Sequence, residues 1–215
     1  MTVFTVEGNV GAGKTTLLKQ LETATFSRPH VVIYEPVDEW MNFRLEEGDK
    51  SLFEMFYEDQ KKYAFVFQMM AMQSRYESMQ KFMEEHADKI IICERSFLTD
   101  CEIFAKLNHR EGNISDIELH VYKKWHTFFM KVLKPTIKGI VYLHAEPAVC
   151  KERIEKRNRH GEEGFSDLYL EKLHESHEMW LSDQTLAPVE RIDASGEIDV
   201  AAVVAFIEKE LGTAA

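Results

Sequence analysis

The chain has 215 residues, of which 45% are hydrophobic, enough for a substantial domain with a sizeable core. Its 26 basic and 37 acidic residues give a net charge of −11, so it lacks the basic surface that long nucleic acids require. Three cysteines without paired metal-ligand spacing argue against a disulfide scaffold or structural zinc and indicate a reducing compartment.

Five short runs rich in β-branched residues alternate with stretches of helical periodicity. The expected strands are TVFTVEG, HVVIYEP, KIIICERS, GIVYLHAEP and PVERIDAS, and the expected helices cover roughly 14–25, 50–85, 97–133, 148–158, 167–186 and 197–211. Nearly continuous apolar strands that alternate with helices predict an α/β fold, with a parallel sheet covered on both faces. Loops are expected after Pro36, at 109–113 and at 157–167.

No linker, repeat or low-complexity segment interrupts this order, so we expect a single domain over residues 1–215. The N-terminus shows no signal peptide or targeting presequence, and no apolar run approaches the roughly 18 residues of a membrane span. We therefore expect a cytoplasmic protein that binds neither membrane nor nucleic acid.

The first strand leads into a glycine-rich loop that a helix follows, the pattern of a phosphate loop. Its backbone N–H groups would turn toward phosphate oxygens, and the helix dipole would add to the attraction. Lys14 would neutralise the β- and γ-phosphates, and the Thr15 hydroxyl would be a ligand of Mg²⁺. The pattern predicts ATP or GTP but not the acceptor. The predicted ATP-binding residues here are Gly8, Asn9, Val10, Gly11, Ala12, Gly13, Lys14, Thr15 and Thr16.

Two further strands end on carboxylates, Glu35 and Glu94. In open parallel sheets the ligand crevice lies at the carboxyl ends of the strands, so both would lie above the phosphate loop if their strands flank the first. One carboxylate can accept the proton of an attacking hydroxyl, and the other can hold a metal. The alternatives are a turn residue for Glu35, which precedes Pro36, and a structural ion pair for Glu94 with Arg95.

Several segments together resemble the deoxyribonucleoside kinases: EGNVGAGKTT, EPVDEW at 35–40, ERSFLTD at 94–100 and RIEKRNRHGEE at 153–163. YLEKLHESHEMWL at 169–181 is also similar to a stretch of this family. The resemblance covers nearly the whole chain and is closest to the branch of deoxycytidine, deoxyguanosine and insect-type multisubstrate kinases. It implies a P-loop kinase with a five-stranded parallel sheet and a short lid. It also implies a homodimer that transfers the γ-phosphate of ATP, with Mg²⁺, to the 5′-hydroxyl of a deoxyribonucleoside in nucleoside salvage.

The resemblance assigns catalytic roles. Glu35 would be the base for the 5′-hydroxyl, and Arg95 and Lys14 would stabilise the transferring phosphoryl group. Glu94 would hold Mg²⁺ together with Thr15.

The resemblance also implies a lid at about 153–166. In it Arg153, Arg157 and Arg159 would clamp the phosphates of ATP, with a solvated basic helix face as the alternative. Glu162 matches the acid that reaches the sugar 3′-hydroxyl, and a one-residue slip would select Glu163 instead.

Polar residues interrupt the apolar stripe of the helix expected at 50–85. At 100° per residue, Tyr57 and Gln68 lie about 20° apart around the axis, and so do Gln68 and Arg75. A partly exposed helix edge is the alternative, but unpaired buried polar groups are costly, and a base-binding pocket explains several in one stripe. The residues predicted to bind the nucleoside are Glu35, Trp40, Phe53, Tyr57, Phe67, Gln68, Arg75, Arg95, Asp100, Phe104 and Glu162.

Within this set, Gln68 offers a donor and an acceptor to a base edge. Phe67 or Phe104 would supply a flat apolar face. The resemblance gives Tyr57 the 3′-hydroxyl and places Trp40 and Phe104 around the ring.

Arg75 and Asp100 predict the base preference. An Arg–Asp pair at the base edge accepts an exocyclic amino group and occupies the room that a thymine methyl needs. We therefore expect deoxycytidine, deoxyadenosine or deoxyguanosine to be preferred over thymidine. Two other functions stay open: a nucleoside monophosphate kinase, and a nucleotide-binding subunit that has lost its catalysis.

Overall fold

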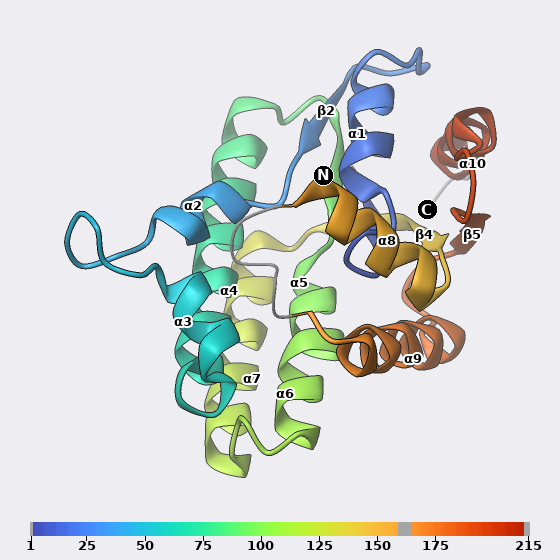
Figure 1. Cartoon of the computed structure of the whole chain (residues 1–215). Coiled ribbons are helices and arrows are strands. Elements are labelled where there is room, and N and C mark those ends of the chain that lie inside the picture. The colour runs from blue at the N-terminus through green and yellow to red at the C-terminus, as the bar shows by residue number, and fades with distance from the viewer. Residues whose placement is uncertain (1, 159–164, 213–215) are drawn as a thin grey trace.

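A computed structural model describes residues 2–158 and 165–212 of the chain. Its centre is a five-stranded sheet with strand order β2-β3-β1-β4-β5, in which every neighbouring pair is parallel (Figure 1). This confirms the expected α/β fold. The strands are β1 (Thr2–Gly8), β2 (His30–Ile33), β3 (Ile90–Glu94), β4 (Thr136–His144) and β5 (Val189–Asp193).

Helices cover both faces of this sheet, as the apolar strands predict (Figure 1). Phe4 of β1 packs in one core with α1 and α10, while Val3 packs in a second core with α4 and α7. A third core joins β4 to α9 and η1. The helices are α1 (Lys14–Glu22), α2 (Val37–Asn42), α3 (Leu52–Glu58), α4 (Gln60–Glu85), α5 (Phe97–Thr99), η1 (Asp100–Ala105), α6 (Lys106–Arg110), α7 (Asp116–Leu133), α8 (Pro147–Arg157), α9 (Asp167–Asp183) and α10 (Val200–Gly212).

The single helix expected over 50–85 is wrong, because the chain breaks between α3 and α4. At the break Asp59 has φ −143° and ψ 80°, and its side chain caps α4 by accepting from the Lys62 N–H at 3.1 Å. Tyr57 therefore does not share a continuous helix with Gln68, and the prediction that both lie on one stripe of a single helix is wrong. What joins them is the packing of α3 on α4, where Phe56 stacks on Phe67 with ring centroids 4.7 Å apart.

The helix expected over 97–133 is also interrupted. α5, η1 and α6 form one continuous segment with a π-helical centre, which ends before Gly112 at φ 74°. Ser115 then starts α7 with a capping box, in which its hydroxyl and the Glu118 carboxylate each accept from the other residue's backbone N–H. The short helix α2 replaces the loop expected after Pro36.

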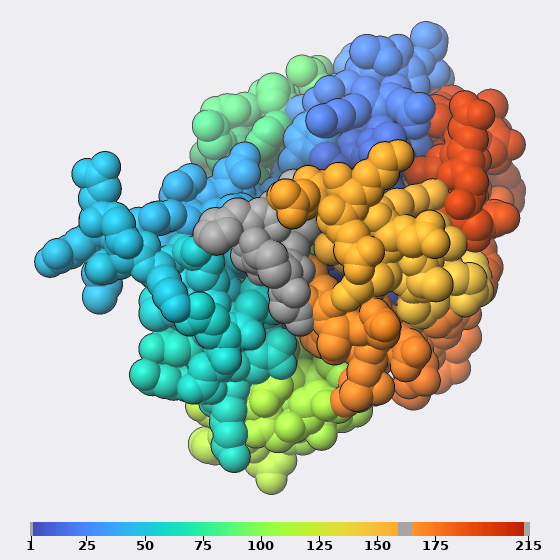
Figure 2. Space-filling model, in the orientation of Figure 1, coloured from blue at the N-terminus to red at the C-terminus, as the bar shows by residue number. Residues whose placement is uncertain are grey.

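The segment between α2 and α3 projects from the body of the molecule (Figure 2). Its apolar side chains Phe43 and Leu45 are exposed. In the part of the chain that the structure describes, no helix is long and apolar enough to cross a membrane.

Candidate active site

The phosphate loop joins β1 to α1 and depends on glycine. Gly8 and Gly11 have φ values of 146° and 80°, a region that side chains rarely adopt. A Cβ on Gly8 would lie 2.7 Å from the Leu143 carbonyl oxygen, and one on Gly11 would lie 2.5 Å from that of Cys150. The loop can therefore follow this path between β4 and α8 only with glycine at both positions.

Lys14 begins α1 and is buried beneath this loop. Its Nζ donates to the Asn9 carbonyl oxygen at 2.8 Å and to that of Gly8 at 3.2 Å. Burial, with Arg95 close by, lowers the pKa of Lys14 to about 8. The Asn9 side chain connects the loop to α9, because its Nδ2 donates to the Leu170 carbonyl oxygen at 2.9 Å.

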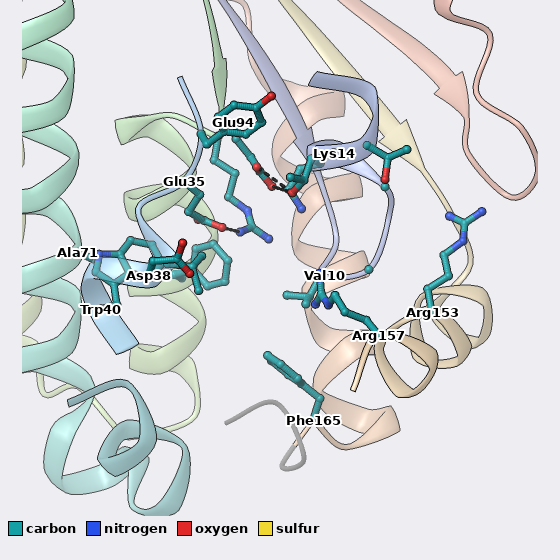
Figure 3. Close-up of a pocket in the computed structure, with 18 of the residues that line it drawn as sticks. Val10, Lys14, Glu35, Asp38, Trp40, Ala71, Glu94, Arg153, Arg157 and Phe165 are labelled. Carbon is teal, nitrogen blue, oxygen red and sulfur yellow. Dashed lines mark hydrogen bonds and ion pairs between the residues drawn. The ribbon is translucent and has the colours of Figure 1, made fainter. Parts of the chain in front are cut away.

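Thr15 and Glu94 meet beside the loop. The Thr15 hydroxyl lies 3.0 and 3.1 Å from the two carboxylate oxygens of Glu94, which ends β3 next to β1. Hydroxyl and carboxylate oxygens are ligands that Mg²⁺ prefers, so these two residues could hold a magnesium ion that also contacts phosphate. Figure 3 shows the labelled Glu94 above Lys14 at one end of the cavity.

Glu35 lies between two arginines just past β2, which ends at Ile33 and not on Glu35 as the sequence predicts. Its Oε2 accepts from Arg95 Nη1 at 2.6 Å, and its Oε1 accepts from Arg75 Nη2 at 3.2 Å. Burial opposes ionisation of this carboxyl, but the charges of Arg95, Arg75 and Lys14 outweigh it and lower the pKa of Glu35 to about 2. The side chain is therefore a carboxylate at neutral pH, held in a fixed direction.

Arg75 holds several groups of the site at once. It donates to both carboxylate oxygens of Asp100, from Nε at 2.7 Å and from Nη2 at 3.1 Å, and to the Glu94 carbonyl oxygen at 2.9 Å. Asp100 lines the cavity, whereas Arg75 does not. The guanidinium thus orients Asp100 and Glu35 from behind the cavity wall.

An apolar slot lies next to these charges. Trp40 and Phe53 pack edge-on against Phe67, with ring centroids 5.6 and 5.8 Å away. Phe104 lies under the Arg95 guanidinium, 4.9 Å from its ring centroid. Gln68 is buried in the wall of this slot, and among the described residues its amide finds no hydrogen-bond partner. A planar group that enters the slot would meet one free donor and one free acceptor.

The phosphate loop, the carboxylates and the apolar slot line one cavity of about 820 Å³. In Figure 3, Trp40 and Asp38 face the cavity from one side, and Val10, Arg153 and Arg157 lie on the other. The predicted site residues that the structure describes all line it, with the exception of Gly8, Asn9, Ala12 and Arg75. Arg159, Glu162 and Glu163 lie outside the described residues.

Comparison with known proteins decides the family. The model of the deoxynucleoside kinase family matches residues 4–208, nearly the whole chain. The chain belongs to the deoxynucleoside kinase family. Its members are ATP-dependent phosphotransferases, so the chain is an enzyme of this class.

Known kinases of this family are similar over most of the chain. Deoxycytidine kinase 2 of Gallus gallus is 34% identical over 200 residues, which cover 85% of this chain and 75% of that protein. The mitochondrial deoxyguanosine kinase of Xenopus laevis is 33% identical over 197 residues, covering 85% and 74%. A probable deoxycytidine kinase of fowlpox virus is 33% identical over 201 residues, covering 90% and 79%.

A further carboxylate that was not predicted as a site residue, Glu7, lies near the end of β1 beneath the phosphate loop. It is fully buried, and it accepts from the Ser96 hydroxyl at 3.1 Å and from the Thr99 hydroxyl at 2.5 Å. These hydroxyls also accept from each other's backbone N–H in the capping box of α5, so their protons are left for Glu7. Burial raises the pKa of Glu7, against the effects of Thr99 and Arg95.

This network fixes the turn that carries Arg95, whose φ of 59° is unusual for a residue with a side chain.

The sequence did contain a signal for Glu7, because it is also a carboxylate near a strand end. Other cavity residues were not predicted as site residues. Tyr169 enters from α9, and Gly196, Glu197 and Ile198 enter from the loop after β5.

Proposed function

We propose that this kinase transfers the γ-phosphate of ATP to the 5′-hydroxyl of a deoxyribonucleoside, in nucleoside salvage. We further propose a preference for deoxycytidine or purine deoxynucleosides over thymidine. The observation that carries the proposal is that a phosphate loop and an arginine-held carboxylate open into the same cavity. Such a cavity can hold a phosphate donor and a hydroxyl acceptor side by side.

On the donor side, the N–H groups of the phosphate loop and Lys14 bind the phosphates of ATP, and Arg153 and Arg157 face the same region from α8. Arg153 donates to the carbonyl oxygens of Ala12, Ser195 and Gly196 at 3.2–3.3 Å, which ties α8 to the loop after β5. The adenine base would lie along this loop. Mg²⁺, when bound by Thr15 and Glu94, would neutralise charge on the β- and γ-phosphates.

On the acceptor side, Glu35 accepts a hydrogen bond from the 5′-hydroxyl and orients it toward the γ-phosphate. A carboxylate with a pKa of about 2 is a weak base for a free alcohol. The hydroxyl becomes acidic as its oxygen bonds to phosphorus, so the proton passes to Glu35 late in the transfer. Arg95 lies 2.6 Å from Glu35 and 3.5 Å from the Gly8 carbonyl oxygen, and it stabilises negative charge between acceptor and donor.

The base of the nucleoside occupies the apolar slot, between Trp40, Phe67 and Phe104. Gln68 binds the base edge, and Asp100, oriented by Arg75, accepts from an exocyclic amino group. Cytosine, adenine and guanine carry such a group and thymine does not. Tyr57 would bind the 3′-hydroxyl, and Glu162 in the lid, about 153–166, would be the second partner of that hydroxyl.

The test is a steady-state panel of the four deoxynucleosides and their ribose counterparts with MgATP. We expect kcat/KM to be highest for deoxycytidine or a purine deoxynucleoside and lowest among the deoxynucleosides for thymidine. Nucleoside monophosphates should not be acceptors, because Arg75 and Arg95, the two cations that contact Glu35 in the described part of the chain, are already paired with carboxylates. Thymidine as the best substrate, or phosphorylation of a monophosphate, would contradict the proposal.

We also propose that the chain is one domain that forms a homodimer through α7. Apolar side chains at helical spacing are exposed along this helix: Ile117, Val121, Trp125, Phe128 and Val132. A second copy of the chain would cover the same stripe by two-fold symmetry. Trp125→Glu should convert a dimer to a monomer in light scattering, whereas a change at the exposed Leu45 should not.

We further propose that the protein is located in the cytoplasm. This location is supported by the three cysteines, each of which is free and buried. Cell fractionation with a mitochondrial marker tests it, and co-purification with mitochondria would contradict it.

A further inference from the structure

Side chains of the types that bind metals meet where α9 crosses the carboxyl end of β4. Among the described residues, the ligand atoms of His144, His174 and Glu178 all lie within 4.8 Å of one another. None of these side chains lines the active-site cavity. The kinase reaction proposed above gives them no role, so the cluster needs its own explanation.

The fold brings the three residues together in a simple way. His174 and Glu178 are four residues apart on α9 and therefore project from the same face of the helix. His144 is the last residue of β4, and its Nε2 lies 3.7 Å from Glu178 Oε1. The rings of His144 and His174 have centroids 5.2 Å apart. Two ligands of one tetrahedral zinc ion lie about 3.3 Å apart, so small side-chain rotations would complete the site.

Neighbouring groups hold the carboxylate in position. The Tyr142 hydroxyl donates to Glu178 Oε1 at 2.7 Å, and Arg191 Nη1 donates to Glu178 Oε2 at 2.7 Å. Such outer hydrogen bonds orient metal ligands in proteins. Arg191 also brings a positive charge close to the position that a cation would take. It opposes binding, although it bonds to the oxygen that faces away from His144.

We propose that His144, His174 and Glu178 bind a zinc ion. Two imidazoles and one carboxylate suit zinc far better than Mg²⁺, which prefers oxygen ligands alone. The fourth position would be taken by water or by the exposed Glu146, whose Oε1 lies 3.9 Å from His144 Nε2.

Zinc at this place would tie α9 to β4. The same helix supports the phosphate loop one turn earlier, where the Leu170 carbonyl oxygen accepts from Asn9 at 2.9 Å. A bound ion stabilises the folded state by mass action. We therefore expect zinc to raise the melting temperature, whether or not the protein phosphorylates nucleosides.

The test uses the full-length chain without a histidine tag and free of nucleotide, because both of these could bind the metal. Excess Mg²⁺ is added to occupy any site made of oxygen ligands alone. Zn²⁺ is titrated by calorimetry, and Co²⁺ is titrated by visible absorption as a spectroscopic substitute. We expect one equivalent to bind, with tetrahedral cobalt bands and no thiolate-to-cobalt band. His144→Gln and His174→Ala should each weaken binding at least tenfold, whereas the exposed His120→Ala on α7 should not change it.

Two further variants keep all three proposed zinc ligands and should change the zinc affinity in opposite directions. Arg191→Met removes an opposing charge as well as one hydrogen bond to Glu178, and because we expect the charge to dominate, zinc binding should tighten. Tyr142→Phe removes an orienting hydrogen bond without changing the charge and should weaken zinc binding about tenfold. Circular dichroism shows whether each variant is folded. The proposal is overturned if the wild-type chain binds no zinc at micromolar concentration or if the two histidine variants bind as it does. A thiolate band would also overturn it, because the metal would then be on a cysteine.

Discussion

The proposed donor half and the proposed acceptor half of the active-site cavity are built in different ways. The phosphate loop is one continuous stretch, Gly8–Thr16, and its path follows from glycines at positive φ within that stretch. The proposed acceptor half collects Glu35, Gln68, Arg95 and Asp100 from β2, α4, β3 and η1 and their connections. A ligand-binding loop can thus be encoded locally, whereas an acceptor pocket exists only after distant segments have packed.

The largest expected effect comes from the acceptor half. Glu35→Gln keeps the shape of the side chain but removes the proton acceptor, so kcat should fall by about 10²–10⁴. Nucleoside binding, measured by calorimetry, should change little. If this variant kept near-full turnover, Glu35 would not be the base.

Gln68→Leu tests whether the base edge is bound from α4. We expect kcat/KM for the preferred nucleoside to fall about 10–100-fold, since a base donor and acceptor would lose their partner, while KM for MgATP stays unchanged. Gln73→Leu, on the exposed side of the same helix, is the matched control. Equal effects of the two changes on kcat/KM would show that Gln68 does not bind the base.

Gly11→Ala addresses the donor half alone. The added Cβ would lie 2.5 Å from the Cys150 carbonyl oxygen at a φ of 80°, so KM for MgATP should rise about tenfold while nucleoside affinity is retained. The control is Gly112→Ala, at a φ of 74° with no atom within 4 Å of the new Cβ. It should cost about 1 kcal/mol of unfolding free energy and leave both KM values unchanged.

Glu7 connects the two halves, because it lies in β1 one residue before the phosphate loop and holds the turn that carries Arg95. Glu7→Gln replaces one carboxylate oxygen with an NH₂ group, which cannot accept the hydrogen bond that a Ser96 or Thr99 hydroxyl donates there. The turn that carries Arg95 would be held less firmly, so kcat should fall about fivefold with both KM values nearly unchanged. Glu118→Gln in the exposed capping box of α7 makes the same change away from the site. A rise in one KM without a loss of kcat would assign Glu7 to only one half.

The smallest expected effect is that of pH. The usual pKa of a glutamate is near 4.5, and the folded protein lowers that of Glu35 to about 2. A carboxyl with a lowered pKa stays ionised until the pH falls toward the lowered value, so kcat/KM for the nucleoside should stay flat from about pH 7 to about pH 4. Circular dichroism at each pH checks that the protein stays folded. An acid limb with an apparent pKa near 4.5 would mean that Arg75 and Arg95 do not hold Glu35 in solution.

Much of the fold follows from the sequence because its signals are local. The five strands are nearly continuous apolar runs, and α8 at Pro147–Arg157 lies within one residue of the helix expected at 148–158. The break at Asp59 was missed, because the apolar periodicity continues across it and only the capping by Asp59 marks the start of α4. The break between α6 and α7 overlaps the loop expected at 109–113, and Ser115 caps the helix that follows it.

The sequence by itself determined the phosphate loop and the family, because both depend on residues that are adjacent or at short fixed spacings. It also marked Glu35, Gln68 and Asp100 as unusual. Only the tertiary structure decided that Arg75 lies behind the cavity wall, that Tyr57 reaches the cavity from a separate helix, and that Glu7 supports Arg95. These facts depend on which groups meet when the sheet and the helices pack, and a buried charge or hydroxyl finds its partner across the fold rather than along the chain.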